Sequence, residues 1–350
     1  MREIGSEFWL ERKVPEPVEG PLLPSKEEDK CYVLSGRTAI DLIIQDIFVS
    51  RQVKKVYMPA WCCDSMIAPF SHRNIHVGFY DVRHTESTES TEIICHLDGT
   101  DYTDIFYVTN YFGYENTLSV ETVRRFKEQG AVILYDRTHS FLMGNDPCLT
   151  LADYSFASIR KWMGVIGGAV VDGVGECELK PCPYLGCKEK AMRMKKAFIE
   201  GDETVDKQAF LNLYTEFGHH LVKDYQNYAM DDLSYAVYKS VDAAAMRRKR
   251  RENARYLQEN LKGVRFMDEL TDQSVPLFVP VFFESKEQRD VVRKKLIEEQ
   301  IYCPIHWPKP ALVPVGFEAN RIYDTELSLI CDQRYDLADM ERMVTQINSI

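Results

Sequence analysis

A lysine with reactive potential stands in the stretch DYSFASIRKWMGVIGGAVV, residues 153–171. Lys161 follows a strand-like run and precedes a Gly-Gly pair that opens another apolar run. The charge of neighbouring Arg160 favours the neutral, nucleophilic amine, and partial burial under Trp162 and Met163 would act in the same direction. Taken alone, Lys161 is better explained as an ordinary lysine on a solvated surface.

A carboxylate occupies the end of an earlier apolar run, ILYDRTHSF, residues 133–141. Asp136 ends this predicted strand, and His139 follows three residues later. Ligands of open α/β sheets bind outside the carboxyl ends of strands, so Asp136 could hold a cationic ring nitrogen there. An aspartate that caps the following loop is the structural alternative. Lys161 lies 25 residues beyond Asp136 and one strand later, which predicts that both side chains meet at one sheet edge.

A possible phosphate site lies in YVLSGRTAIDLII, residues 32–44. A Ser-Gly turn leads directly into an amphipathic helix and leaves several N–H groups unpaired at the positive end of the helix dipole. Such a helix start binds phosphate well. A plain helix cap is the alternative interpretation of this stretch.

Lysine, carboxylate and phosphate-binding helix start together match the needs of one cofactor. Pyridoxal phosphate uses a lysine for its internal Schiff base, a carboxylate that faces the pyridinium nitrogen, and a helix start for its phosphate. The carboxylate keeps the ring nitrogen protonated, so that the ring accepts electrons when a Cα proton leaves. The combination therefore predicts a pyridoxal phosphate enzyme.

The elements that must position these residues alternate between strands and helices. Helices are predicted over 38–52 and 118–130, and this alternation indicates a mainly parallel sheet covered on both faces. The pattern becomes helical from about residue 184, and the segment 233–261 could bridge to a second α+β unit. That unit is predicted to contain strands 264–270, 277–283 and 301–308 with helices 286–300 and 336–350. The strands of the first part are predicted over 55–59, 76–81, 104–110, 131–136, 153–158 and 168–172.

The order of the motifs resembles the DegT/DnrJ/EryC1/StrS family, the sugar aminotransferases of fold type I. The likeness covers nearly the whole chain. It implies an α/β fold with a mainly parallel, seven-stranded-type sheet in a large cofactor-binding domain (31–235), a small C-terminal α+β domain (236–350) and an N-terminal arm over the surface (1–30). The motifs, in order, are SGRTAI, VYMPAWCCDSMIAPF, VTNYFGY, ILYDRTHSF, SFASIRKW with GGAVV, RRENARYL, and IHWP with LSLICDQRY.

The resemblance assigns roles around the cofactor. Lys161 would form the Schiff base and move the proton between Cα and C4′, while Asp136 would pair with the pyridine nitrogen. His139 matches a family position near the phenolic oxygen of the ring. Gly36 and Arg37 match the turn that holds the phosphate, although many family members have threonine in place of Arg37.

Other assignments by resemblance stay open. Either Ser155 or Ser158 would add a hydroxyl to the phosphate site. Trp61 or a near neighbour would lie on the ring face, and a simple count places the family's aromatic position close to Cys63. The substrate candidates are Asn110 and Tyr111 after the third predicted strand, Asn227 in QNYAMDD, and His306 in IHWPKP. His306 and the adjacent Trp307 could face the site, but the pair could equally pack between domains.

The implied activity is transfer of an amino group to a keto sugar. Glutamate is the expected donor, a nucleotide-linked keto sugar is the expected acceptor, and a homodimer with sites at the interface is the expected assembly. Dehydration or another lyase reaction of pyridoxal phosphate is one alternative. A sensor that binds the cofactor or a nucleotide without catalysis is another, because fold alone does not fix function.

Composition agrees with a small-molecule enzyme. The chain has 350 residues with 43 Lys and Arg against 54 Asp and Glu, a formal net charge of −11, which argues against nucleic-acid or membrane binding. The basic run 246–251, MRRKRR, lies in a helical pattern and is expected on a solvated helix face. The absence of a long apolar stretch or signal-type N-terminus predicts a soluble cytoplasmic protein.

The ten cysteines do not suggest a disulfide framework, and most are expected to be reduced, buried thiols. Cys177, Cys182 and Cys187 have the spacing C-x4-C-x4-C, which matches no common zinc arrangement. No metal site is therefore predicted.

Overall fold

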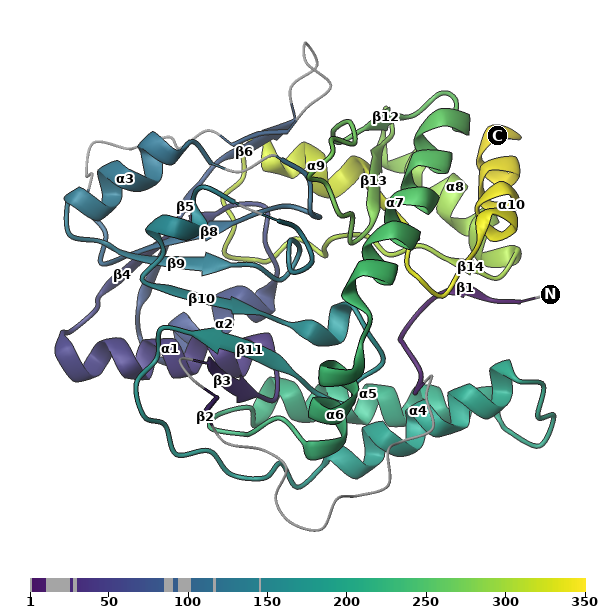
Figure 1. Cartoon of the computed structure of the whole chain (residues 1–350). Coiled ribbons are helices and arrows are strands. Elements are labelled where there is room, and N and C mark those ends of the chain that lie inside the picture. The colour runs from purple at the N-terminus through teal and green to yellow at the C-terminus, as the bar shows by residue number, and fades with distance from the viewer. Residues whose placement is uncertain are drawn as a thin grey trace.

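The computed structural model describes residues 2–10, 26–27, 30–84, 91–93, 102–115, 118–144 and 146–350. A large sheet with its helices forms one part of the molecule, and the C-terminal strands and helices form a second part beside it (Figure 1). Within the described residues, no helix is both long enough and apolar enough to span a bilayer.

The central sheet is mainly parallel, as predicted. Only β11 and β2 run against the common direction of the strands, so the pairs β10–β11, β11–β3 and β3–β2 are antiparallel. The two-residue β2 adds an eighth strand to the expected seven. The strand order is β2 (Lys26–Glu27), β3 (Lys30–Val33), β11 (Ala169–Asp172), β10 (Tyr154–Ala157), β9 (Val132–Asp136), β8 (Ile105–Thr109), β4 (Lys55–Pro59), β5 (His76–Tyr80).

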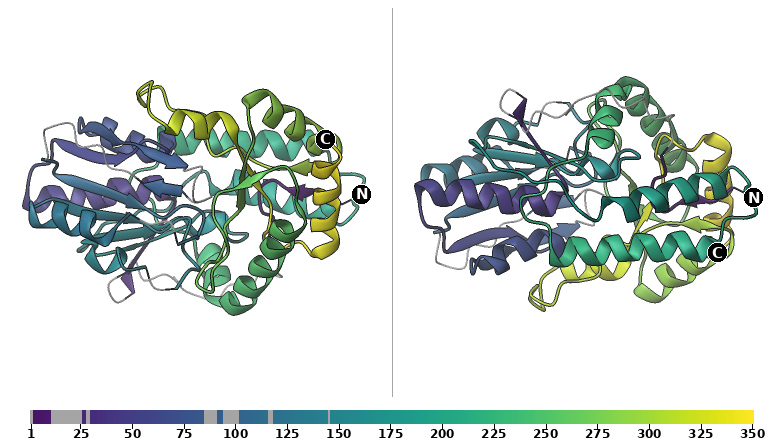
Figure 2. Two further views of the ribbon diagram at one scale, coloured as in Figure 1. Left: turned by 90° about the horizontal axis from the view of Figure 1, so that it is seen from above. Right: turned by 90° about the horizontal axis from the view of Figure 1, so that it is seen from below.

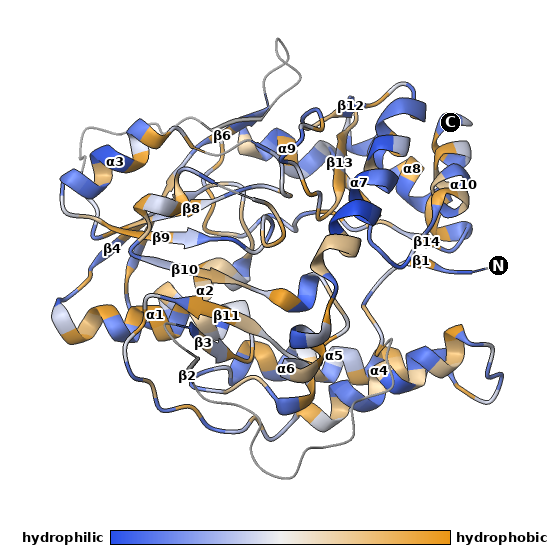
Figure 3. Ribbon diagram, in the orientation of Figure 1, coloured by the Kyte–Doolittle hydropathy of each residue, from blue (hydrophilic) through white to orange (hydrophobic). Residues whose placement is uncertain are grey.

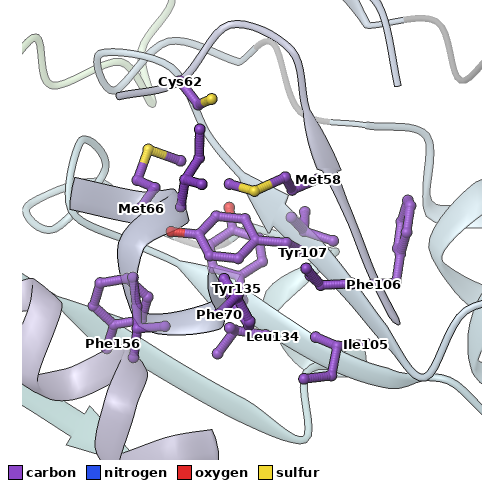
Figure 4. Close-up of a cluster of buried hydrophobic side chains, with 14 of the residues drawn as sticks. Met58, Cys62, Met66, Phe70, Ile105, Phe106, Tyr107, Leu134, Tyr135 and Phe156 are labelled. Carbon is purple, nitrogen blue, oxygen red and sulfur yellow. The ribbon is translucent and has the colours of Figure 1, made fainter. Parts of the chain in front are cut away.

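The strands of this sheet form because continuous apolar runs can be buried on both faces. All five residues of β8 are buried. Figure 4 shows Tyr107 of this strand in a cluster of buried side chains that includes Met66, Phe70 and Tyr135. The register pairs Asp136 with Thr109 on one side and with Phe156 on the other. The carboxyl ends of β8, β9 and β10 therefore meet at one edge, as the sequence predicted.

Three helices accompany this sheet. α1 (Gly36–Ser50) packs on β10 and β11 and against α2 (Asp64–His72), while α3 (Val120–Glu128) packs on β8 and β9. The right-hand view of Figure 2 shows α1 lying across the sheet. Short 3₁₀ turns follow β9 and β10, namely η1 (Leu149–Leu151) and η2 (Ile159–Lys161).

The helical region predicted from residue 184 is an antiparallel pair, α4 (Leu185–Ile199) and α5 (Lys207–Lys223). The segment expected as one bridge over 233–261 is divided into α6 (Asp232–Ser240) and α7 (Ala243–Asn260). Asp242 causes the division, because its side chain accepts the N–H of Ala245 and starts a new helix.

The basic run in α7 differs from its prediction at one position. Much of the helix is hydrophilic (Figure 3), and Arg248 is exposed. Arg250, however, is fully buried, because its guanidinium lies over the ring of Trp162 at 4.5 Å and donates to the carbonyl of Leu277. The prediction of a wholly solvated face was therefore wrong at Arg250.

The C-terminal unit is the expected α+β arrangement. Its antiparallel sheet has the order β12 (Arg265–Phe266), β13 (Val279–Phe282), β15 (Glu326–Leu329). α8 (Lys286–Glu298) and α10 (Leu337–Asn348) pack beside it, and α10 contacts α7. The predictions missed β15 and α9 (Ala319–Thr325), and strand 301–308 is reduced to β14 (Ile301–Tyr302).

The start of the chain corrects the prediction of an arm over the surface. β1 (Ile4–Gly5) pairs in parallel with β14, and Ile4, Trp9 and Leu10 are buried. Figure 1 shows the N-terminal segment running beside the C-terminal unit. Apolar side chains at these positions make burial favourable. Residues 11–25 of the predicted arm lie outside the described part.

A small hairpin of β6 (Val82–His84) and β7 (Thr91–Ile93) flanks the polar repeat TESTESTE. The loop predicted for this repeat is wrong for residues 91–92, which belong to β7. Residues 85–90 of the repeat lie outside the described part.

Candidate active site

A cavity of about 310 Å³ lies at the carboxyl edge of the central sheet. It is lined from the ends of β8, β9 and β10, from the start of α1 and from the loop that leads into α2. The cavity brings together the main residues singled out in the sequence. These are Gly36, Arg37, Asp136, His139, Ser158 and Lys161.

Asp136 is the last residue of β9, and its carboxylate is held by two hydrogen bonds. The hydroxyl of Tyr107 donates to Oδ2 at 2.7 Å, and the backbone N–H of Thr138 donates to Oδ1 at 2.8 Å. Burial raises the pKa of Asp136, while the bonds from Thr138 and Tyr107 and the charge of Lys161 lower it. A cation placed against this buried carboxylate would be strongly stabilised.

Lys161 ends η2, and its Nζ lies 3.4 Å from Nε2 of His139. Burial lowers the pKa of Lys161, and Arg160 acts in the same direction, which agrees with the like-charge effect predicted from the sequence. The ring facing the amine differs from the predicted Trp162, because Nζ lies 5.9 Å from the ring centre of Trp307. Trp162 is buried and lies under Arg250 instead.

His139 lies between aromatic rings. Its ring centre is 4.6 Å from that of Phe112 and stacks at 5.5 Å on Trp307. Burial lowers the pKa of His139 well below its usual value, and the charges of Lys161 and His306 add to this. Its Nδ1 is buried and has no hydrogen-bond partner among the described residues. His139 therefore lines the cavity as a neutral imidazole, with its buried Nδ1 left without a hydrogen-bond partner among the described residues.

The start of α1 forms the other wall of the cavity. Ser35 Oγ accepts the N–H of Thr38, so this side chain serves as the helix cap. A Cβ at Gly36 would lie 3.4 Å from Ser158, which leaves the backbone close to that hydroxyl-bearing side chain. Arg37 donates to the carbonyl of Leu221, but its buried Nε has no hydrogen-bond partner within the described chain. Burial lowers the pKa of Arg37.

The two candidate serines occupy different surroundings. Ser158 lines the cavity. Ser155 does not line it, because its Oγ donates to Asp172 Oδ2 at 2.9 Å, on the neighbouring strand β11. Only Ser158 is therefore placed to contact a ligand in this cavity.

Three predicted contact residues lie outside the cavity lining. Trp61 stacks on Tyr111 with ring centres 4.5 Å apart and donates from Nε1 to the carbonyl of His306. Tyr111 in turn donates to the carbonyl of Trp61, and Asn110 donates to the carbonyl of Tyr114. These side chains hold the loops together, and Cys63 lines the cavity where Trp61 was expected.

The remaining two substrate candidates also differ in position. Asn227 accepts a hydrogen bond from Gln45 at 2.8 Å and lies outside both cavities near Lys161. His306 lines a second cavity of about 440 Å³, which Lys161 also lines. Its backbone N–H donates to Glu326, and its Nδ1 lies 2.8 Å from the hydroxyl of Ser328.

Sequence reasoning missed several residues that line or support the site. Tyr107 supports Asp136 from the next strand, and its position two residues before the end of β8 was the available signal. Glu7 lines the cavity and pairs with Lys188 at 2.8 Å, although it is far from every motif. Trp307 was not missed, because the His306–Trp307 pair was expected either to face the site or to pack between domains, and Trp307 lines the first cavity.

Of the comparisons with known proteins, only the one with solved structures finds a match. No protein-family model matches the sequence, and a search of curated proteins finds no match. The chain is similar to solved structures, and three of them have TM-scores of 0.62 to 0.63. The aminotransferase TlmJ from Streptoalloteichus hindustanus has 19% identity and a TM-score of 0.63, with 92% of this chain and 85% of that chain covered.

The other two are similar to the same extent. The PLP form of Spr1654 from Streptococcus pneumoniae has 12% identity and a TM-score of 0.63, covering 91% of this chain and 86% of the other. A DegT DnrJ EryC1 StrS aminotransferase from Brucella abortus has 15% identity and a TM-score of 0.62, covering 91% and 85%. The chain has the fold of these aminotransferases. The α/β, fold-type-I architecture expected from the sequence is therefore confirmed.

Proposed function

We propose that the protein is a pyridoxal-phosphate-dependent aminotransferase of the DegT/DnrJ/EryC1/StrS type. The observation that carries the proposal is the placement of Lys161, His139 and Asp136 on one cavity at the sheet edge. The shared fold with aminotransferases, one of them in its PLP form, supports the same conclusion.

The residues present fit the cofactor. The buried carboxylate of Asp136 suits a protonated ring nitrogen, and the unpartnered Nδ1 of His139 suits a polar substituent of the ring. The start of α1, the unpartnered Nε of Arg37 and the hydroxyl of Ser158 suit a phosphate. Cys63 replaces Trp61 as the candidate for the ring face.

When bound, pyridoxal phosphate supplies an electron sink that makes the Cα proton of an amino substrate removable. Lys161 would hold the cofactor through Nζ, and its lowered pKa favours the neutral amine that this requires. Once the amino substrate has replaced Lys161 on the cofactor, the freed Nζ would take the proton from Cα of the substrate and deliver it to C4′ of the cofactor. Tyr107 and Thr138 fix the orientation of Asp136, and the aromatic rings of Phe112 and Trp307 keep water from His139.

The substrates follow from the same proposal. Glutamate would donate the amino group, and a keto sugar linked to a nucleotide would accept it, as the family resemblance of the motifs implies. We also propose a homodimer, a division into domains near residue 235, and a cytoplasmic location. Nine described cysteines, none of them in a disulfide, are consistent with a reducing compartment.

Covalent trapping of the cofactor tests the proposal. Purified protein reconstituted with pyridoxal phosphate and reduced with borohydride should carry the label on the peptide that contains Lys161. The Lys161→Ala protein should not be labelled, and Lys190→Ala, at an exposed lysine on α4, should behave like the wild type. Glutamate should shift the absorbance of the loaded protein and release 2-oxoglutarate.

Two outcomes would overturn the proposal in different ways. Labelling at another lysine would show that the wrong residue has been assigned. A cofactor that binds at Lys161 but responds to no amino donor would favour the non-catalytic sensor.

A further inference from the structure

A second cavity, of about 440 Å³, lies against the first and shares three of its lining residues. The shared residues are Glu7, Arg160 and Lys161. Its other walls come from the N-terminal segment and from the C-terminal unit, including Phe8, Tyr302 and His306. Lys161 therefore lies at the junction of two spaces, and the start of α1 lines only the first.

Two of the three arginines that line the second cavity are bound to the protein itself. Arg250 is fully buried and donates to Gln333 and to the carbonyl of Leu277, each at 2.9 Å. Arg334 pairs with Asp332 at 2.8 Å and lies 3.9 Å from the ring centre of Phe8. Their donors are already used in holding the walls.

Arg160 is different. Among the described residues, none forms a hydrogen bond or an ion pair with its guanidinium, and its Nε is buried. Glu7 is close enough for the charge of Arg160 to help lower its pKa to about 2, but Lys188 is the largest cause and holds the Glu7 carboxylate at 2.8 Å. Arg160 is half-buried, and its Nε is shielded from water without a hydrogen-bond partner among the described residues, so an anionic ligand at this position would be favourable.

We propose that Arg160 binds the carboxylate of an amino-acid or oxo-acid substrate in the second cavity. The inference rests on the proposed function, because it places the reacting carbon of that substrate at Lys161 Nζ. The planar fork of a guanidinium matches a carboxylate with two parallel hydrogen bonds. Because Arg160 and Lys161 line the same cavity, one substrate can reach both, as the short distance from carboxylate to amine in an amino acid requires.

The distribution of charges separates this role from phosphate binding. The first cavity already has the start of α1, the side chain of Arg37 and the hydroxyl of Ser158 for a phosphate. Arg37 lines only the first cavity, whereas Arg160 lines both and is the guanidinium that can reach a ligand in the second. In the second cavity the acidic groups Glu7 and Asp332 are each paired with a basic side chain. Arg160 is then the cation left for a ligand.

The test is a titration with glutarate, a dicarboxylate that has no amino or keto group to react. Calorimetry on the cofactor-loaded and the cofactor-free protein should show binding to both, since the contact is with Arg160. Arg160→Gln should weaken glutarate binding at least about tenfold, and Arg160→Lys, which keeps the charge but loses the fork, should give an intermediate value. Arg248→Gln, at an exposed position of α7, is the matched control and should not change binding.

A kinetic measurement distinguishes a specific loss of carboxylate binding from a general loss of folded protein. In the loaded protein, Arg160→Gln should raise the KM for glutamate by a larger factor than the KM for n-butylamine, which lacks a carboxylate and therefore reports only the effect of Arg160 on the pKa of Lys161. Unchanged glutarate binding in Arg160→Gln would overturn the inference, even if Lys161 is shown to carry the cofactor. Weakened binding of pyridoxal phosphate with unchanged glutarate affinity would also overturn it and assign Arg160 to the phosphate.

Failure of the proposed function gives a distinguishable result. In that case Lys161 would not be labelled after borohydride reduction, yet glutarate binding to the unloaded protein would still report on Arg160.

Discussion

At the scale of single residues, some of the predicted side chains line the cavity and others are hydrogen-bonded within the fold. Asp136, His139, Ser158 and Lys161 line the cavity, whereas Ser155 and Trp61 are bound within the fold. Sequence position predicted the first group because strand ends of a parallel sheet share one edge. It could not separate Ser155 from Ser158, because that difference depends on which way each side chain points beside β11.

The two serines give a direct prediction. Ser158→Ala should weaken binding of pyridoxal phosphate roughly tenfold, because one hydrogen bond to a charged group contributes about 1.5 kcal/mol or more. Ser155→Ala should leave the affinity unchanged, since this hydroxyl bonds Asp172. Fluorescence titration of the unloaded proteins with the cofactor measures both constants. Equal weakening in the two variants would show that the orientation of these serines is wrong.

At the scale of elements, β15 links the C-terminal unit to the cavities through a buried hydrogen-bond relay, which consists of Glu326, Ser328 and His306. Ser328 donates to the carboxyl of Glu326, which also accepts the backbone N–H of His306, while Ser328 contacts the ring of His306 at 2.8 Å. Glu326 is fully buried. Burial raises its pKa to about 8, although Ser328, His306 and Arg289 act in the opposite direction. The folded protein therefore keeps this carboxyl protonated at neutral pH.

The relay predicts how stability depends on pH. The pKa of Glu326 is about 8 in the folded state and 4.5 as its ordinary value. Its stabilising contribution is therefore complete below pH 4.5 and is lost as the pH rises through 8. Between these two pH values, the free energy of unfolding of the wild type should fall relative to that of Glu326→Gln by up to about 1.4 kcal/mol per pH unit. Urea unfolding at pH 5, 7 and 9 measures it, and a constant difference would contradict the assigned pKa.

Helices and strands were predictable from sequence where a run of neighbouring residues defines them. Buried strands such as β8 and β9 stand out because their runs are apolar throughout. α2 was missed because Pro69 interrupts the helical pattern. β15 was missed because its residues ELSL include a glutamate and a serine that only the buried relay explains. The same limit applies to the site, since Glu7 comes from a segment that no local pattern connects to Lys161.

At the scale of the whole molecule, the first ten residues join parts that are distant in sequence. β1 pairs with β14, and Glu7 reaches the cavity and binds Lys188 of α4. Lys195 of the same helix donates to the hydroxyl of Ser6. Trp9 is buried, and the guanidinium of Arg334 lies 4.9 Å from its ring centre. This segment is therefore a structural part of the site and of the contact between units.

The contribution of the segment can be measured at Trp9. Trp9→Ala should lower the free energy of unfolding by about 3 kcal/mol or more, as expected for removing a buried aromatic side chain. Val49→Ala, at a position that is 88% exposed, should change it by no more than about 0.5 kcal/mol. Urea unfolding monitored by circular dichroism checks both variants. Similar small changes in the two would show that the segment is not packed as described.

The pairing of β1 with β14 also sets an order of events during synthesis. Ile4 pairs with Ile301, so the first strand leaves the ribosome long before its partner is made. Closing a loop of this length carries an entropic cost that only later contacts can offset. The central sheet can assemble earlier, because all its strands precede residue 173. The wall that Glu7 gives to the reaction cavity is therefore among the last parts of the nascent chain to reach its place.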